Sequence, residues 1–297
     1  MKILVTGSSG LVGRALVTRL GAEGHEVTRL VRRPAQGANE IQWDPAKGTL
    51  DLGGRVFDGV VHLAGANIAD GRWNAARKRD ILESRRQGTT LLAEALAAQA
   101  TPPKVLVSAS AIGFYGNTGN APMREDGPAG RGFLAEVCQV WEESVKPAED
   151  AGLRVVRLRI GVVLSTQGGA LAKMLTPFKL GAGGKIGSGD QVMSWITLDD
   201  LVSAIVFALG EDSLRGPVNA VAPGAISNAG FTRSLGKALG RPTIFPMPAF
   251  AAKLAFGEMA EELLLGGSRV VPAALEGAGF RFAHPEIDPA LKHVLGK

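Results

Sequence analysis

The chain contains 297 residues, of which 45% are hydrophobic, enough to bury the core of one large domain or of a large and a small one. Its formal net charge is +5, but the basic residues occur in scattered pairs among acids, which argues against a nucleic-acid-binding protein. The single cysteine, Cys138, excludes an internal disulfide and a multi-cysteine metal site, and favours a reducing cytoplasm.

Strand and helix patterns alternate through the first half of the chain. Strands are predicted at 2–6, 26–32, 58–64, 104–109 and 154–160, and helices at 11–23, 75–99 and 132–151. The segment 41–43 is a candidate for an additional strand between the second strand and the one at 58–64. Right-handed crossovers make consecutive strands of this kind parallel, so the alternation predicts an α/β Rossmann fold, a doubly wound parallel sheet with helices on both faces.

Glycines and prolines interrupt this alternation beyond about residue 165. Helices are predicted there at 199–210, 228–239, 249–265 and 288–295. We therefore divide the chain into a dinucleotide-binding Rossmann domain over residues 1–165 and a smaller substrate-side lobe over residues 166–297. A strand near 217–222 falls within the lobe but is expected to complete the sheet.

A phosphate-binding motif is predicted at residues 2–13, where a strand, a glycine turn and a helix start follow one another. Gly7 allows a sharp turn, Gly10 lets backbone N–H groups approach a diphosphate, and Gly13 lets the helix pack close to the strand. A purely structural turn is the alternative, and the surrounding alternation favours cofactor binding over it. The predicted contacts are Gly7, Ser9, Gly10, Leu11, Val12 and Gly13.

The second strand ends in Val31, Arg32 and Arg33, where the adenosine ribose is expected to lie. Proteins that bind NAD usually place an acid there to accept a hydrogen bond from the ribose 2′-hydroxyl. Arginines suit a 2′-phosphate instead, so NADP(H) is favoured over NAD(H). The alternative is a pair of solvated surface arginines, and it is stronger for Arg33 than for Arg32.

Two further strand ends are expected to face the cofactor. Leu63, Ala64 and Gly65 follow the strand at 58–64 and allow the backbone to pass beside the adenine and ribose, while His62 is interpreted as a packed strand histidine. Ser108 ends the strand at 104–109, where a serine hydroxyl can hold the nicotinamide amide or a substrate carbonyl.

Several segments together carry a family resemblance: VVHLAGANI at 60–68, ILESRRQGTT at 81–90, SASAIGFYG at 108–116, RLRIGVVL at 157–164 and IGSGDQVMSWITLDDL at 186–201. With the glycine motif, they resemble the atypical short-chain dehydrogenase/reductases called epimerase family proteins, of the YfcH type. The resemblance covers the whole chain, and residues 227–297 look like the small C-terminal domain of this group. It implies NADP(H) binding through Val31, Arg32, Leu63, Ala64, Asp80, Arg85 and Val163.

Asp80 and Arg85 lie about one helical turn apart in a predicted helix. On one interpretation they share a face near the cofactor. An exposed ion pair on the helix is the alternative.

The resemblance leaves the reaction open. In the wider superfamily a tyrosine acts as general acid or base, and a lysine four residues later lowers its pKa. Leu134 and Cys138 stand at the corresponding positions of the predicted helix, and the sole tyrosine, Tyr115, is followed four residues later by Gly119. Ser110 and Tyr115 are the candidates for catalysis, with packing or substrate-wall roles as the alternatives. Cys138 is interpreted as a buried, inert thiol.

A glycine-rich stretch at 181–189 leaves room for a ligand, and in extended relatives the matching loop touches a nucleotide-sugar substrate. Gly187, Gln191, Ser194 and Trp195 are the predicted substrate contacts, and for Trp195 a core position is the alternative. Asp199 is interpreted as the N-cap of the helix that follows.

Two functions are compatible with these features. The first is an NADP-dependent oxidoreductase or epimerase-like enzyme acting on a carbonyl, carbinol or nucleotide-sugar-like substrate. The second is a non-catalytic NADP(H)-binding sensor or regulatory protein.

Features that the sequence lacks lead to expectations about metal binding, membrane association and cellular compartment. The four histidines show no ligand spacing, so no metal is expected. No apolar run approaches membrane-spanning length and no signal peptide is recognised, so we expect a soluble cytoplasmic protein with a small-molecule substrate and no membrane partner. The sequence specifies neither a particular substrate nor an oligomeric state.

Overall fold

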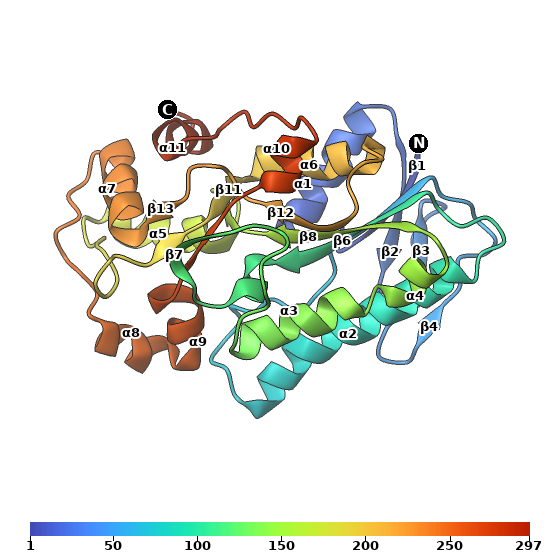
Figure 1. Cartoon of the computed structure of the whole chain (residues 1–297), viewed down its shortest axis with the longest axis horizontal. Helices are drawn as coiled ribbons and strands as arrows, with labels where there is room; N and C mark the ends of the chain where they lie inside the picture. The colour runs from blue at the N-terminus through green and yellow to red at the C-terminus, as the bar shows by residue number, and fades with distance from the viewer.

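The apolar runs of the first half form the centre of an eight-stranded sheet in the computed structural model, which describes residues 1–297 (Figure 1). The strands lie in the order β12-β8-β6-β5-β1-β2-β3-β4, and every neighbouring pair is parallel except β3 and β4. Their bounds are β1 Lys2–Thr6, β2 Glu26–Val31, β3 Glu40–Asp44, β4 Thr49–Leu50, β5 Gly59–His62, β6 Val105–Ala111, β8 Arg154–Ile160 and β12 Gly216–Ala220. The expected doubly wound Rossmann sheet is confirmed, and β3 includes the candidate strand at 41–43.

The strand order reverses at β1, which is the feature that positions a ligand. The chain adds β2 and β3 on one side of β1 and β5, β6 and β8 on the other. Thr6 at the end of β1 is in register with Leu30 of β2 and His62 of β5. The segments that leave these three strands therefore diverge from one crevice at the carboxyl edge, where doubly wound folds bind their ligands.

Helices cover both faces because successive side chains of each strand point to opposite sides. Ile3 and Val5 pack with α1 (Leu11–Ala22), α6 (Leu198–Gly210) and α10 (Ala273–Gly277), and Leu4 packs with α2 (Ala75–Ala97) and α4 (Lys146–Asp150) on the other face. Helix α3 (Phe133–Glu143) lies beside α2 (Figure 1). No helix of the chain is both long and apolar enough to cross a lipid bilayer.

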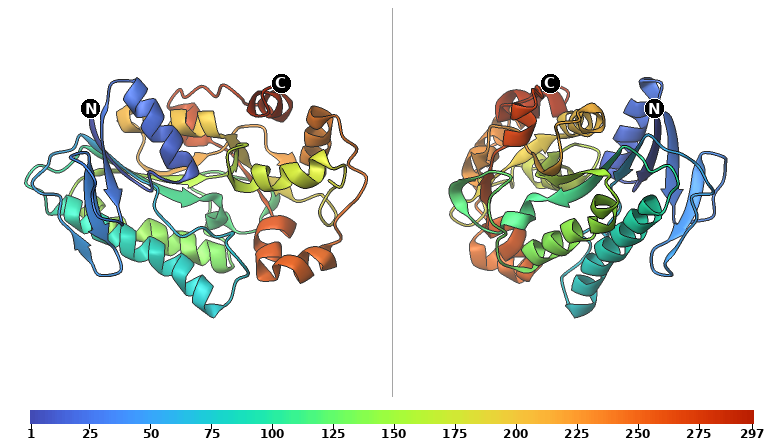
Figure 2. Two further views of the ribbon diagram at one scale, coloured as in Figure 1. Left: turned by 180° about the vertical axis from the view of Figure 1, so that it is seen from behind. Right: turned by 45° about the vertical axis from the view of Figure 1, so that its right-hand side comes forward.

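A second, smaller core forms around α5 (Gly169–Lys179), α7 (Asn228–Leu239) and α11 (Ile287–Val294). Short strands join it to the rest of the chain: β7 Gly119–Met123, β9 Val162–Leu164, β10 Val192–Met193, β11 Trp195–Thr197, β13 Ile226–Ser227 and β14 Ser268–Val270. Helices α8 (Ala249–Phe256) and α9 (Glu258–Ala260) lie on the side of α2 and α3, whereas α11 lies on the side of α6 and α10 (Figures 1 and 2). The division of the chain at residue 165 stays a prediction. Two elements beyond residue 165 belong to the first part in space, because β12 is the edge strand of the sheet and α6 packs against one of its faces.

Two helices that were each predicted as continuous are divided into shorter elements. The helix at 132–151 is two helices, α3 and α4, because Pro147 in the first turn of α4 has no backbone N–H to continue a hydrogen-bond ladder. The helix at 249–265 ends at Phe256, because Gly257 adopts a φ of 61° that a helix does not accept, and the chain resumes as α9 and a π-helical turn at 261–265.

The assignment of Asp199 as an N-cap is also wrong. Thr197 caps α6, since its hydroxyl accepts a hydrogen bond from the Asp200 backbone N–H at 3.1 Å. Asp199 instead lies in the first turn of the helix, where its side chain is free to make other contacts.

The core of the sheet gives a first test. Leu158 of β8 is fully buried, so Leu158→Ala removes packing that nothing replaces and should lower the free energy of unfolding by about 2–5 kcal/mol. Leu180, which is 79% exposed, provides the control, and Leu180→Ala should leave the denaturant midpoint almost unchanged. Equal midpoints for the two variants would contradict this position of β8 in the core.

Candidate functional site

The glycine loop between β1 and α1 is packed too closely to admit side chains. Gly7 has a φ of 65°, and a Cβ there would lie 2.7 Å from the Leu63 carbonyl carbon. A Cβ on Gly13 would lie 2.2 Å from the Gly7 carbonyl oxygen, which fixes the start of α1 against the loop. The loop is closed by a hydrogen bond from the Gly10 N–H to the Gly7 oxygen at 3.0 Å.

The start of α1 is suited to an anion. The first N–H groups of a helix, here at Leu11 and Val12, have no intrahelical acceptor, and in α1 no side chain caps them at Gly10 and no acid occupies the first turn. The Ser9 carbonyl accepts from Arg14, while the Ser9 side chain is exposed beside this helix end. An uncapped N-terminus behind a glycine turn fits a diphosphate.

Thr6 joins this loop to the end of β5. Its Oγ1 accepts hydrogen bonds from the backbone N–H groups of Leu63 and Ala64 at 3.0 and 3.2 Å, and it also contacts His62 Nδ1 at 2.8 Å. The other His62 nitrogen bonds Thr89 at 2.9 Å. Burial lowers the pKa of His62 to about 4, so the ring is neutral at physiological pH and has a packing role, as its interpretation from the sequence proposed.

The two arginines after β2 differ in their surroundings. Arg33 donates two hydrogen bonds of 2.7 Å to the Glu40 carboxylate, and these bonds are the main reason that the pKa of Glu40 falls to about 2. The Arg32 residue is exposed, and its guanidinium makes no hydrogen bond or ion pair within the chain. Glu40 therefore competes for Arg33, and only Arg32 has a guanidinium fully available to a phosphate.

Arg85 anchors α2 to the segment after β5. Its Nη1 donates to the carbonyl oxygens of Ala66 and Ile81 at 3.1 and 3.0 Å, and a Cβ on Gly65 would lie 3.3 Å from its guanidinium carbon. Asp80 does not pair with Arg85. It pairs with Arg77 on the exposed side of the helix, so of the two residues only Arg85 adjoins Leu63–Ala66.

Ser108 and Val163 complete the predicted cofactor set. Ser108 is 1% exposed, is in register with His62, and its Oγ has no hydrogen-bond partner within the chain. A buried hydroxyl without a partner is costly, so a ligand group that bonds it would remove that cost. Val163 of β9 packs at the edge of the same core cluster as Leu11, Val12 and Leu63. Residues far apart in sequence thus converge around the glycine loop.

A buried polar network that the sequence did not reveal lies behind Ser110. The Ser110 hydroxyl donates to Glu142 Oε1 at 2.7 Å, and Glu142 accepts two hydrogen bonds of 2.8 Å from Arg159. Burial disfavours the charge on Arg159, but the bonds and charge of Glu142 outweigh it and raise the pKa of Arg159. The only sequence signal was an arginine within the apolar β8 pattern and a glutamate on the apolar face of α3.

Tyr115 belongs to the same network and is fully buried. Its hydroxyl donates to Asn219 Oδ1 at 2.7 Å and accepts from Arg159 Nη1 at 2.8 Å. Burial raises the pKa of Tyr115, and Arg159 only partly offsets this effect. Of the roles considered from the sequence, packing fits Tyr115 better than catalysis or a substrate wall, because the ring is enclosed and both of its hydrogen bonds are internal.

Two residues predicted to touch a substrate, Ser194 and Trp195, are instead bonded to backbone groups elsewhere in the chain. The Ser194 hydroxyl donates to the Ser268 carbonyl and accepts from the Val270 N–H, both at 2.8 Å. Trp195 is fully buried and donates to the Gly224 carbonyl at 2.8 Å. These contacts leave neither side chain free for a substrate.

Gly187 and Gln191 also make internal contacts. The Gly187 N–H donates to the Met247 carbonyl at 2.9 Å, and the Gln191 amide donates to the Ile186 and Leu264 carbonyls at 3.0 and 2.7 Å. A surface cavity of about 520 Å³ lies beside this stretch and includes none of the predicted cofactor residues. It is lined by Asn120, Asp190, Val192, Ala225, Ile226, Ser227 and Arg269.

The C-terminal segment also closes over the starts of α2 and α3. Lys78 of α2 pairs with Glu258 of α9 at 2.6 Å, and Arg72 donates to the Leu254 carbonyl of α8. The Glu262 carboxylate accepts from the backbone N–H groups of Phe133 and Leu134 at 3.3 and 3.4 Å, so it caps α3 from the opposite lobe. These contacts bring the two parts of the chain together at the crevice.

Family models match both parts of the chain. Residues 3–220 match the NAD dependent epimerase/dehydratase family, and residues 247–294 match a domain of unknown function, DUF1731. The chain belongs to the NAD dependent epimerase/dehydratase family. Epimerase family protein Mb2239 of Mycobacterium bovis is 45% identical to this family member over 293 residues, which are 98% of this chain and 97% of that protein.

Solved structures agree with the fold. The human epimerase family protein SDR39U1 (isoform 2), crystallised with NADPH, superposes with a TM-score of 0.92 at 37% identity and covers all of both chains. A nucleoside-diphosphate sugar epimerase from Corynebacterium glutamicum superposes with a TM-score of 0.81 at 38% identity, over all of this chain and 58% of the other. The resemblance inferred from the sequence is thus confirmed.

The buried thiol gives a test of the interior of the site. Cys138 is 3% exposed, and burial raises its pKa from 9.0 to about 12, so at pH 8 the native thiolate fraction should be about a thousandfold below that of a free thiol. Labelling by a chromogenic disulfide reagent should therefore be negligible in the native chain and complete after unfolding in guanidinium. Rapid labelling of the native chain, absent from Cys138→Ser, would show that the thiol is accessible.

Proposed function

We propose that this protein binds NADP(H) at the glycine loop and acts as an oxidoreductase or epimerase-like enzyme on a carbonyl or carbinol carbon. The observation that carries the proposal is the convergence of an uncapped helix start, a loop without room for Cβ atoms, and the partnerless Ser108 hydroxyl at one strand edge. A dinucleotide supplies the groups that each of these features lacks.

The chemistry of each residue indicates which part of the cofactor it would bind. The N–H groups at Leu11 and Val12 suit the diphosphate, and the free guanidinium of Arg32 suits a 2′-phosphate. The human relative crystallised with NADPH supports the same nucleotide. The Ser108 hydroxyl is suited to the nicotinamide amide or to a substrate carbonyl.

Bound NADP(H) supplies hydride chemistry, so the chain itself must orient the substrate and manage a proton. Ser110 is the better placed of the two predicted catalytic residues, because its strand also carries Ser108 and its hydroxyl oxygen can still accept a hydrogen bond. Tyr115 is enclosed and its pKa is raised, which makes it a poor proton donor. Water or the substrate then supplies the proton.

The name of the Corynebacterium relative supports a nucleoside-diphosphate sugar as the substrate class. Such a substrate carries carbinol carbons that a hydride carrier can oxidise and reduce again. Its diphosphate would need cationic or N–H partners in the crevice between the two parts of the chain, where Arg72 and Lys78 lie.

One observation favours a second candidate, a non-catalytic NADP(H)-binding protein. Both predicted catalytic hydroxyls, on Ser110 and Tyr115, already donate to buried partners within the chain. In that case the bound nucleotide would change the contacts of α8 and α9 with the starts of α2 and α3, and a partner would read the change.

The nucleotide assignment is tested by Arg32→Ala. Loss of a charge-assisted contact to the 2′-phosphate should weaken NADPH binding about ten- to a hundredfold and leave NADH binding nearly unchanged, measured by calorimetry. Arg19→Ala removes the same charge from an exposed position of α1 that pairs with Glu23, and it should affect neither nucleotide. Equal losses for NADPH and NADH would refute the role of Arg32.

The catalytic proposal is tested by following NADPH absorbance with aldehydes, ketones and nucleoside-diphosphate sugars. We expect turnover by the wild type, a kcat lowered at least about tenfold in Ser110→Ala, and a nearly unchanged kcat with a lowered melting temperature in Tyr115→Phe. If NADPH raises the melting temperature but no substrate is turned over, the non-catalytic candidate is favoured. Unaltered turnover in Ser110→Ala would exclude Ser110.

A further inference from the structure

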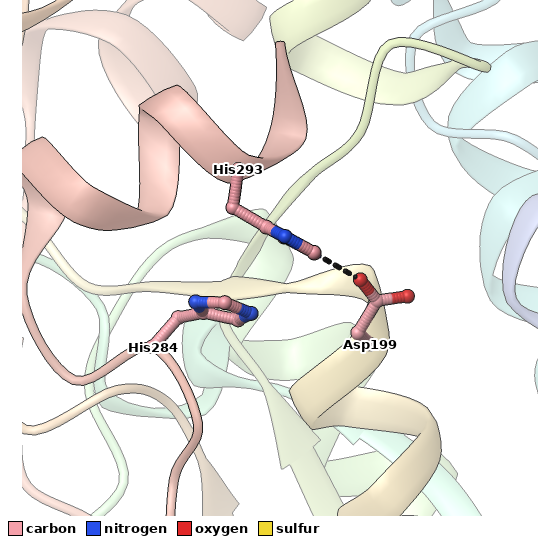
Figure 3. A group of neighbouring side chains, drawn as sticks. All are labelled: Asp199, His284 and His293. Atoms are coloured by element: carbon pink, nitrogen blue, oxygen red, sulfur yellow. Dashed lines mark hydrogen bonds and ion pairs between the residues drawn. The ribbon is translucent and has the colours of Figure 1, made fainter. Parts of the chain in front are cut away.

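Two of the four histidines meet at a surface that none of the predicted cofactor or substrate residues occupies. His284 follows α10, His293 belongs to α11, and Asp199 lies in the first turn of α6. One side-chain ligand atom of each lies within 4.8 Å of those of the other two. Figure 3 shows both imidazole rings extending toward the Asp199 carboxylate. Sequence spacing gave no sign of this group, because its members come from three separate segments.

The three side chains are held in an ordered arrangement. His293 Nε2 lies 2.6 Å from Asp199 Oδ2. The His284 and His293 rings stack with centroids 4.0 Å apart and planes inclined by 22°. The stack therefore holds both rings side by side next to the Asp199 carboxylate, and imidazole nitrogens are common metal ligands.

The backbone beneath the cluster is fixed from the interior. Asp200, which is 2% exposed, accepts hydrogen bonds from the Ala283 and His284 N–H groups at 2.8 and 3.0 Å. Ala290 and Leu291 bury the inner side of α11 in the smaller core. Since Thr197 caps α6, the Asp199 carboxylate is not needed at the helix start. Of the two consecutive acids of α6, Asp200 therefore holds the backbone at 283–284 and Asp199 contacts His293.

Two imidazoles and one carboxylate form a ligand set for a divalent ion such as zinc, with water as a fourth ligand. Around a tetrahedral ion, bonds of about 2.0–2.2 Å hold the ligand atoms about 3.4 Å apart, so His293 Nε2 and Asp199 Oδ2, now 2.6 Å apart, would separate to admit the ion. The side chains of His293 and Asp199 are 47% and 66% exposed, so they can rotate by the small amount required without disturbing the core. Magnesium and calcium prefer oxygen ligands and should not be bound.

We propose that Asp199, His284 and His293 form a binding site for a first-row divalent transition metal of the zinc type. The ion would replace the direct contact between His293 and Asp199 and would tie the C-terminal helix α11 to the start of α6. The site is separate from the glycine loop, so the proposal stands or fails independently of the proposed function.

The test uses the full chain without a histidine tag. Calorimetric titration with Zn²⁺ should reveal one saturable site, and Zn²⁺ should raise the melting temperature while Mg²⁺ at the same concentration does not. His284→Asn and His293→Asn should each raise the Zn²⁺ dissociation constant at least about tenfold. Both variants keep the buried Asp200 contacts, so they are expected to fold.

His25 is the matched control, because its ring also lies near an acid, with Nε2 3.7 Å from Glu23, but no second histidine adjoins it. His25→Asn should bind Zn²⁺ as the wild type does. Absence of a saturable site in the wild type would overturn the proposal. So would Zn²⁺ affinity that survives in both His284→Asn and His293→Asn, or that is lost in His25→Asn, and the cluster would then be a hydrogen-bonded pair with a stacked neighbour.

Discussion

The close approach of the glycine loop to the end of β5 is the constraint on which the site depends. Gly7 lies against the Leu63 carbonyl and Gly13 against the Gly7 carbonyl, at separations that no Cβ would allow. Thr6 then holds the Leu63 and Ala64 N–H groups in place from the end of β1. Because these contacts join the two strands at which the sheet order reverses, they set the shape of the crevice and the direction of α1 together.

A second constraint lies on the other side of the crevice, where charged groups are buried. Arg159 and Glu142 neutralise each other, Ser110 donates to Glu142, and Arg159 donates to the Tyr115 hydroxyl, which in turn donates to Asn219. A buried pair of this kind adds little net stability but is costly to break, so it fixes one arrangement of α3, β6, β8 and β12. The network thereby specifies the floor beneath the predicted active site, and it also withdraws the Tyr115 hydroxyl from any substrate.

The C-terminal part of the chain, residues 227–297, lies against the other side of the crevice. It reaches the starts of α2 and α3 through Glu258 and Glu262, and it is held from beneath by Ser194 and Trp195. The contacts of α8, α9 and Glu262 with the starts of α2 and α3 thus join it to the helices that follow β5 and β6. This arrangement suits an enzyme that closes on its substrate and equally a protein whose shape reports nucleotide binding.

The sequence by itself determined what depends on local pattern. The alternation of strands and helices predicted the sheet, the glycine spacing predicted the loop, and Arg32 beside Val31 indicated the nucleotide. Only the tertiary structure decided which side chains are already engaged. Arg33 forms an ion pair with Glu40, Asp80 forms one with Arg77, and Asn219 accepts a hydrogen bond from Tyr115.

The physical reason is that a hydrogen bond or ion pair depends on distance in space, and its partner can lie anywhere along the chain. Tyr115 and Asn219 are 104 residues apart, and His293 and Asp199 are 94 apart. Burial and partnership of this kind arise only when the segments have packed. Backbone geometry such as the Gly7 turn, in contrast, is imposed by the residue itself and its neighbours, and can therefore be read from the sequence.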